Sequence, residues 1–76
     1  TWEELAGFEV LNADDNDSRI GTLSYVDDAT ENVLFSVEKP DGNEVLIPAS
    51  DEFIISVDAE NRKIRVSLPE GLLDLS

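Results

Sequence analysis

The feature that most constrains the fold of this chain is a series of short segments in which apolar and polar residues alternate. NVLFSVEK places Val33, Phe35 and Val37 on one face, and NEVLIP does the same with Val45 and Ile47. A period of two is typical of a half-buried β-strand. The residues KPDGN between the two segments have the Pro-Asp-Gly chemistry of a tight turn. Together they predict a β-hairpin.

Further segments of the same kind predict four more strands. GFEVLN carries the first, RIGTLSYVDD the second, and FIISVD and KIRVSL form a second hairpin joined by AENRK. Pro48 and Pro69 each end a strand, because proline cannot donate to a ladder of hydrogen bonds. The alternation predicts a core that includes Phe35, Ile47, Ile55, Val57, Ile64, Val66 and Leu68.

The second predicted strand departs from strict alternation. Its apolar residues are Ile20, Leu23 and Val26, a spacing that indicates a bulge or bend just after Gly21. Such a bend would curl the sheet. We also expect the glycine to be needed for a conformation that other residues avoid.

Six short strands in 76 residues favour an all-β fold, a closed or nearly closed six-stranded barrel, with an open sheet as the alternative. The ending PEGLLDL suits a short helical turn that begins at Pro69. We expect Leu72, Leu73 and Leu75 of this turn to cap the core of the barrel. The alternative is that these leucines form a partner-binding tail.

The composition disfavours an active site. The chain has no histidine and no cysteine, the commonest catalytic and metal-ligating side chains, so we expect no enzyme, no metal and no cofactor. Asp14, Asn16 and Ser18 alternate like ligands of a calcium loop. However, Arg19 and Tyr25 stand where such a loop needs glycine and glutamate, so a solvated hairpin loop is favoured.

The charge points to the kind of partner. Eighteen acidic against five basic residues give a net charge of −13, which repels nucleic acid and attracts a basic protein. No apolar run approaches the ~20 residues of a membrane span, so no membrane partner is expected.

The assembled segments resemble a known family, the C-terminal PRC-barrel domain of the bacterial ribosome maturation factor RimM. The similar stretches follow the order of that family and cover nearly the whole chain: WEELAGFEV (residues 2–10), IGTLSYV (20–26), NVLFSV (32–37), EVLIPA (44–49) and VDAENRKIRVSLPEGLLDL (57–75).

The resemblance implies that residues 1–76 are one PRC-barrel domain, the C-terminal part of a longer two-domain chain. It also implies a monomeric, cytoplasmic, non-enzymatic factor that binds the small (30S) ribosomal subunit and assists maturation of 16S rRNA. The implied direct partner is small-subunit protein nineteen, with 16S rRNA contacted through the N-terminal domain. The alternative is another PRC-barrel protein that acts as a scaffold or as a membrane- or electron-transfer-associated module.

The candidate partner-binding residues lie near the two ends of the sequence. They are Trp2, Glu3 and Glu4 at the start and the three leucines of the terminal turn. Trp2 suits either packing on the barrel or an interface, where tryptophan is a frequent anchor. The family often has an aromatic pair just before this tryptophan, linked to ribosome binding, and here only Thr1 precedes it. No binding role is therefore carried over from that pair.

Overall fold

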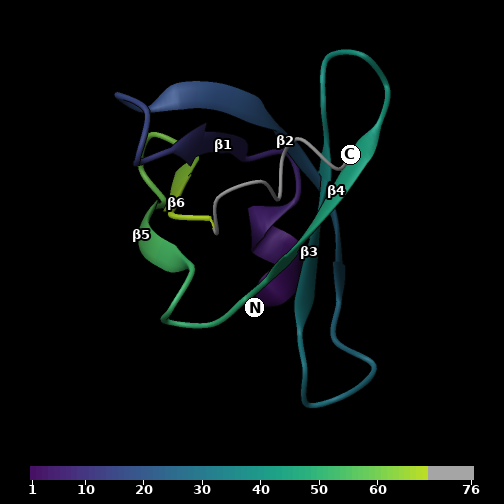
Figure 1. The fold of residues 1–76 in the computed structure, drawn as a ribbon. Helices are drawn as coiled ribbons and strands as arrows, with labels where there is room; N and C mark the ends of the chain where they lie inside the picture. Colours follow the sequence, from purple (N-terminus) through teal and green to yellow (C-terminus); the bar gives the residue numbers. More distant parts are fainter. Residues whose placement is uncertain (69–76) are drawn as a thin grey trace.

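The computed structural model describes residues 1–68 as a short 3-10 helix followed by six β-strands (Figure 1). The 3-10 helix η1 spans Trp2–Leu5. The strands are β1 Glu9–Asn12, β2 Ser18–Asp27, β3 Leu34–Glu38, β4 Glu44–Pro48, β5 Ile54–Asp58 and β6 Lys63–Val66. The prediction of six strands is confirmed. The predicted terminal turn, with Pro69 and the three leucines, lies outside the described residues.

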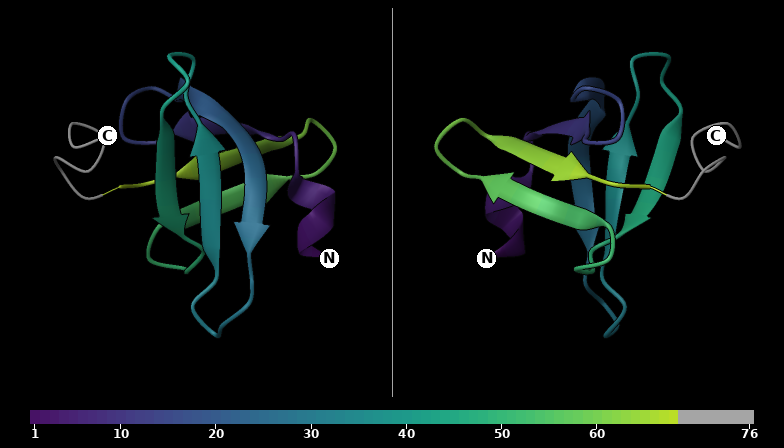
Figure 2. Two further views of the ribbon diagram at one scale, coloured as in Figure 1. Left: turned by 90° about the vertical axis from the view of Figure 1, so that its right-hand side faces the viewer. Right: turned by 60° about the vertical axis from the view of Figure 1, so that its left-hand side comes forward.

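The strands form one sheet in the order β4-β3-β2-β1-β6-β5. Neighbouring strands are antiparallel except for β1 and β6, which are parallel. The long strand β2 belongs to both halves of the sheet, because Thr22 is the partner of Glu9 in β1 and of Glu38 in β3. Figure 2 shows β2, β3 and β4 in one layer, with β5 and β6 crossing behind it. Within residues 1–68 the outer strands β4 and β5 do not pair, so this barrel-type sheet is not closed.

Two register shifts allow β2 to pass from one half of the sheet to the other. Ile20 is the extra residue opposite β1, and Ser24 is the extra residue opposite β3. An extra residue bends a strand and increases its twist. The predicted irregularity is therefore present, but as two bulges that flank Gly21 instead of one bend just after it.

Glycine is required at position 21 because the backbone of Glu38 lies very close to it. It lacks the positive φ found at Gly7 and Gly42, so the expected special conformation is wrong. A Cβ atom at Gly21 would instead lie 2.1 Å from the carbonyl oxygen of Glu38. The absence of a side chain lets the backbone at the end of β3 lie close against Gly21 of β2.

The core lies between the two layers and is formed by inward-facing apolar side chains. The buried cluster consists of Phe8, Val10, Ile20, Leu23, Phe35, Val37, Val45, Ile47, Ile64 and Val66, and Leu68 packs against it half-buried. The predicted positions of Phe35, Ile47, Ile64 and Val66 are thus confirmed.

Two predicted core residues, Ile55 and Val57, are exposed, with 49% and 46% of their surface accessible. Ile55 is the extra residue of a third bulge, and Ile54 packs against the core in its place. Val57 pairs with Ile64 but lies on an outer strand of the open sheet. A single extra residue changes which side chains face inward, and alternation alone does not reveal it.

Both predicted hairpin turns are present. Gly42, with φ +88°, donates its amide to the carbonyl of Lys39 at 2.9 Å, which closes the Pro-Asp-Gly turn between β3 and β4. In the turn between β5 and β6, Asp58 accepts hydrogen bonds from the backbone amide and the side-chain amide of Asn61, at 3.1 and 2.8 Å. Arg62 completes that turn with φ +56°.

Replacing Ile64 by alanine tests the placement of the core. The side chain is fully buried, so its loss should lower the free energy of unfolding by about 2–5 kcal/mol. Ile55→Ala, the same substitution at an exposed position, should cost much less. Denaturant unfolding of both variants makes the comparison, and equal losses would contradict the assignment of Ile64 to the core.

Gly21→Ala tests the close approach of the Glu38 backbone to β2. The added Cβ would overlap the backbone of Glu38, and relieving such overpacking costs about 1–3 kcal/mol. The control, Thr22→Ala, changes the neighbouring residue of the same strand and should cost less than about 1 kcal/mol. If thermal unfolding shows no difference between the two variants, backbone does not approach Gly21 this closely.

Candidate protein-binding surface

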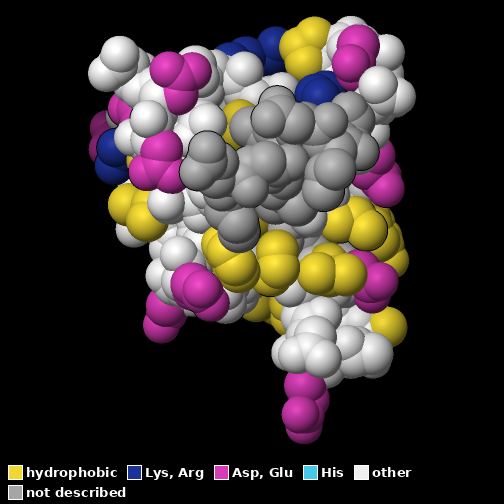
Figure 3. All heavy atoms as spheres, in the orientation of Figure 1, with side chains coloured by type: hydrophobic (Ala, Val, Ile, Leu, Met, Phe, Trp, Pro, Cys, Tyr) yellow, Lys and Arg dark blue, Asp and Glu magenta, His cyan; other side chains and the backbone are white. Residues whose placement is uncertain are grey.

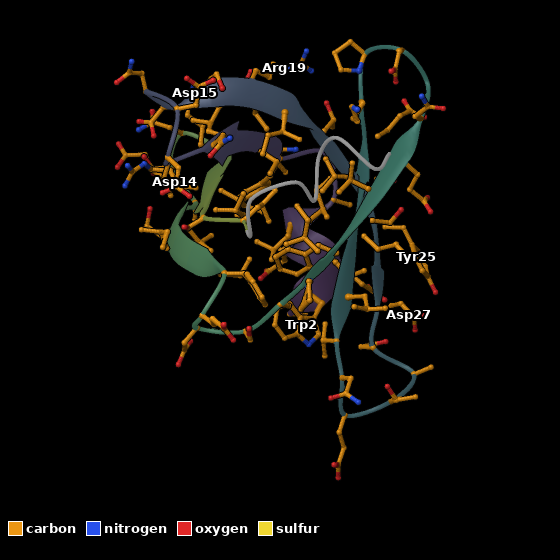
Figure 4. All side chains as sticks on the ribbon, in the orientation of Figure 1. Trp2, Asp14, Asp15, Arg19, Tyr25 and Asp27 are labelled. Carbon is orange, nitrogen blue, oxygen red and sulfur yellow. The ribbon has the colours of Figure 1, made fainter. Side chains whose placement is uncertain are left out.

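An open groove of about 360 Å³ lies between η1 and the second half of β2. Trp2, Glu3 and Ala6 line one side of it, and Ser24, Tyr25, Val26 and Asp28 line the other. Two of the candidate residues named from the sequence, Trp2 and Glu3, are therefore part of one surface feature. Figure 4 shows Trp2 on η1 and Tyr25 near the end of β2.

Trp2 both packs on the barrel and presents a free surface. Its ring meets the ring of Phe35 edge-on, with 5.7 Å between centroids and 72° between planes. Edge-to-face contacts of this kind stabilise aromatic pairs, so the buried Phe35 holds the indole in place. Trp2 still leaves 40% of its surface accessible. The structure thus supports packing and leaves the ring available for contact.

The bulge at Ser24 places Tyr25 on the outer surface. Leu23 faces the core, so strict alternation would turn Tyr25 inward; the extra residue reverses this, and 61% of Tyr25 is accessible. The Ser24 hydroxyl donates to the carbonyl of Ser36 at 3.1 Å, which fastens the bulge to β3. The hydroxyl of Ser36, itself buried, donates to the carboxylate of Glu44.

Sequence reasoning missed Tyr25 and Asp28 as part of this surface. One signal for an outward residue was present in the sequence: Leu23 and Val26, both apolar, are three residues apart. This spacing was interpreted above as a bend just after Gly21. That spacing also requires an extra outward residue between Leu23 and Val26, and Tyr25 occupies the outer face as a result.

Most of the basic residues are engaged elsewhere. Lys63 and Arg19 both contact the carboxylate of Glu9, at 3.0 and 3.1 Å, and Arg65 contacts Asp17 at 2.9 Å. These ion pairs lie across β1, β2, β6 and the loop before β2. The hydrogen bond from Lys63, followed by the charges of Lys63 and Arg19, lowers the pKa of Glu9 below its usual value.

Arg62 is exposed and contacts residues close to the groove. Its guanidinium lies 5.1 Å from the centroid of the Phe8 ring and donates to the carbonyl of Ala6 at 3.3 Å. The groove itself is lined by no basic residue. Within residues 1–68, no ion pair or side-chain hydrogen bond involves the carboxylates of Glu3 and Asp28. Their charges are therefore not neutralised by a side chain of the described residues.

The space-filling view shows where the basic side chains lie on one face. In Figure 3 the visible lysine and arginine side chains lie along the upper and left margins, among acidic side chains, and the lower half shows acidic and apolar side chains. A second depression of about 290 Å³ lies at this end, lined by residues of the β2–β3 loop and of the segment after β4, including Glu31, Val33 and Ala49.

The remaining candidates are placed as follows. Glu4 is exposed and does not line the groove. The leucines Leu72, Leu73 and Leu75 lie outside the described residues.

The loop that resembles a calcium site is held by hydrogen bonds within the loop and to the segment after β6. Asp14 accepts from the hydroxyl of Ser67 at 2.7 Å, and Asp15 accepts from the hydroxyl of Ser18 at 2.9 Å. Among the residues that the structure describes, no group of three or more acidic, histidine or cysteine side chains is arranged to hold a metal ion. No helix in the described part is long and apolar enough to cross a membrane.

The strand order, the bulged β2 and the barrel-type curl define the class of this chain: a small six-stranded domain of the PRC-barrel type. The family model described as the RimM PRC barrel domain matches residues 2–72, and the chain belongs to this family. The sequence resemblance is thereby confirmed.

Curated relatives agree with this assignment. The chain is 40% identical over 75 residues to the ribosome maturation factor RimM of Porphyromonas gingivalis, covering 99% of this chain and 42% of that protein. It is 44% identical over 75 residues to the protein of the same name from Bacteroides thetaiotaomicron, covering 99% and 41%. The chain therefore spans about two fifths of the length of these relatives.

A solved structure shows the same fold. The 16S ribosomal RNA processing protein RimM of Pseudomonas aeruginosa superimposes with a TM-score of 0.78, covering 91% of this chain and 43% of that one. The two sequences are 20% identical over the aligned part. The fold is therefore retained through extensive change in sequence.

The free energy of unfolding should depend on pH because the ion pairs of Glu9 with Arg19 and Lys63 require an ionised carboxylate. Because folding lowers the pKa of Glu9 from its ordinary value of 4.5, its contribution to stability is present above that pH and is lost as pH falls through the folded pKa. The difference in free energy of unfolding between the natural chain and Glu9→Gln should therefore be largest near neutral pH and shrink below about 4.5.

The matched control is Glu31→Gln, which removes the same charge at a residue that forms no ion pair within residues 1–68. Removing any negative charge from a chain of net charge −13 reduces electrostatic repulsion, and the Glu31 variant measures this general effect. Denaturant unfolding at several pH values measures both differences. If the Glu9 and Glu31 variants follow the same pH curve, the ion pairs of Glu9 do not contribute to folding.

Proposed function

We propose that this domain is the protein-binding module of a bacterial ribosome assembly factor that acts in the cytoplasm. In this proposal the domain binds the free 30S subunit through the basic small-subunit protein nineteen and assists maturation of 16S rRNA. The observation that carries the proposal is the face around the groove, where exposed aromatic rings lie beside carboxylates that no base within residues 1–68 neutralises. The relatives named as ribosome maturation factors supply the setting.

The charge distribution supports a basic protein as the direct partner. A net charge of −13 attracts basic proteins over a distance and repels the phosphates of RNA. Four of the five basic residues contact Glu9, Asp17 or the Phe8 ring, which disfavours a continuous positive stripe along which RNA could lie. Contacts with 16S rRNA are assigned to an N-terminal domain of a longer chain, of which these residues form the C-terminal part.

The carboxylates support a binding role over a catalytic one. A general acid that works near neutral pH needs a raised pKa. The pKa shifts at Glu9, Asp41 and Asp58 are all downward, caused mainly by hydrogen bonds to these carboxylates. Such groups stay ionised at neutral pH and suit charge complementarity with a partner.

The test is to measure association and dissociation rates with small-subunit protein nineteen by surface plasmon resonance at low and high salt. Attraction between opposite charges is screened over about 8 Å at physiological ionic strength, so the association rate should fall with salt. Dissociation should change less, because it depends on the small desolvated centre of an interface.

Charge reversal locates the contact. Glu3→Lys, at the groove, should slow association more than Asp15→Lys, which makes the same change of charge in the β1–β2 loop, far from Trp2 in Figure 4. Both variants should retain nearly the natural melting temperature, since exposed charges contribute little to folding. An association rate that does not vary with salt, or absence of binding to this protein, would contradict the proposal.

A further inference from the structure

We infer that the groove between η1 and β2 is a receptor for an arginine side chain of the basic partner, held between Trp2 and Tyr25 and paired with Glu3 and Asp28. The inference rests on the proposed function for the basic nature of the partner and adds the chemistry of the contact.

The aromatic residues supply surfaces on which a guanidinium can lie. Trp2 and Tyr25 line the same groove from different elements, and 40% and 61% of their surfaces are accessible. Contact with Phe35 fixes Trp2, and the bulge held by Ser24 directs Tyr25 outward. A cation within about 6 Å of such a ring is attracted by its π-electron face, most strongly for tryptophan. Both rings are therefore placed before a ligand arrives.

The carboxylates supply charge and acceptors. Glu3 and Asp28 line the groove, and neither forms an ion pair within residues 1–68. Glu9 and Asp17, in contrast, already contact the domain's own basic side chains. A cation that enters the groove thus meets two carboxylates, neither of which is paired with a basic side chain of residues 1–68.

The molecule contains an internal counterpart of the proposed contact. Arg62 lies over the Phe8 ring while its guanidinium donates to the carbonyl of Ala6, a residue that also lines the groove. An aromatic face and an oxygen acceptor therefore already hold one arginine next to this site. The groove likewise offers aromatic faces and oxygen acceptors, and its acceptors are carboxylates instead of a carbonyl.

The chemistry favours arginine over other occupants. The planar guanidinium stacks on rings and donates two parallel hydrogen bonds to a carboxylate, whereas the ammonium of lysine is a compact, strongly hydrated charge. An apolar side chain would remove water from Glu3 and Asp28 without replacing the lost hydrogen bonds. A nucleotide could stack on the rings, but its phosphates would face the same two carboxylates.

The test uses probes that report on the groove itself. The chain contains a single tryptophan and a single tyrosine, so the indole N–H signal of Trp2 and the ring signals of Tyr25 are unambiguous in NMR spectra. The chain is titrated with a short peptide containing three arginines and, separately, with the same peptide carrying citrulline, a neutral isostere, at those positions. The arginine peptide should shift both sets of signals saturably, and the citrulline peptide should not.

Variants separate the groove from the general acidity of the chain. Asp28→Asn should weaken binding of the arginine peptide several-fold more than Asp15→Asn, which makes the same change of charge in the β1–β2 loop. Tyr25→Phe keeps the ring and should bind nearly as well as the natural chain, whereas Tyr25→Ala should bind several-fold more weakly. Circular dichroism and melting temperature establish that each variant is folded.

Several outcomes would overturn the inference. They are equal effects of the arginine and citrulline peptides, equal effects of Asp28→Asn and Asp15→Asn, or saturable shifts of Trp2 and Tyr25 by a single-stranded oligonucleotide in place of the peptide.

Binding to small-subunit protein nineteen is measured separately on the same variants. If that protein does not bind but the arginine peptide does, the proposed partner is wrong and the receptor chemistry stands. If that protein binds equally to the natural chain and to Tyr25→Ala, the partner stands and the groove is not its contact.

Discussion

The sharing of β2 between both halves of the sheet is the constraint on which the rest of this structure depends. Thr22 is paired on one side with β1 and on the other with β3, so the two layers are joined by a single continuous strand. At this point the backbone of Glu38 in β3 lies close to β2 without an intervening side chain, and Gly21 provides that space. Because the core lies between the two layers, its packing follows from the way β2 turns.

The sequence predicted the elements of this fold well and their irregularities poorly. Alternation located six strands and most of the core, because one side of each strand is buried and the period of two records which side. It placed Ile55 in the core wrongly, because a bulge adds a residue without any distinctive local chemistry. For the same reason the outward position of Tyr25 was not predicted. The apolar spacing in β2 was visibly irregular, but two bulges separated by three residues give a pattern that a single bend could also explain.

The candidate site was predictable only in part, since it depends on segments distant in sequence. Trp2 and Glu3 were identified from their residue types and their position near the start of the chain. Asp28 became a candidate only when the fold brought the end of β2 beside η1. The overall acidity was evident from composition, but which acids are neutralised was not. That distinction arises because β6 brings Lys63 and Arg65 next to acids of β1 and of the β1–β2 loop, far away in the sequence.

The open strand order has a consequence for how copies of this domain behave toward one another. Within residues 1–68, β4 and β5 are the outer strands of the sheet, and such edges invite pairing with a strand of another molecule. Two copies of this chain would approach each other with charges of −13 each, so their edges are kept apart by mutual repulsion. The repulsion acts only between like-charged molecules. Acidity of the kind that would attract a basic protein therefore also opposes self-association, and it protects the outer strands of residues 1–68 without the closure that other small barrels use.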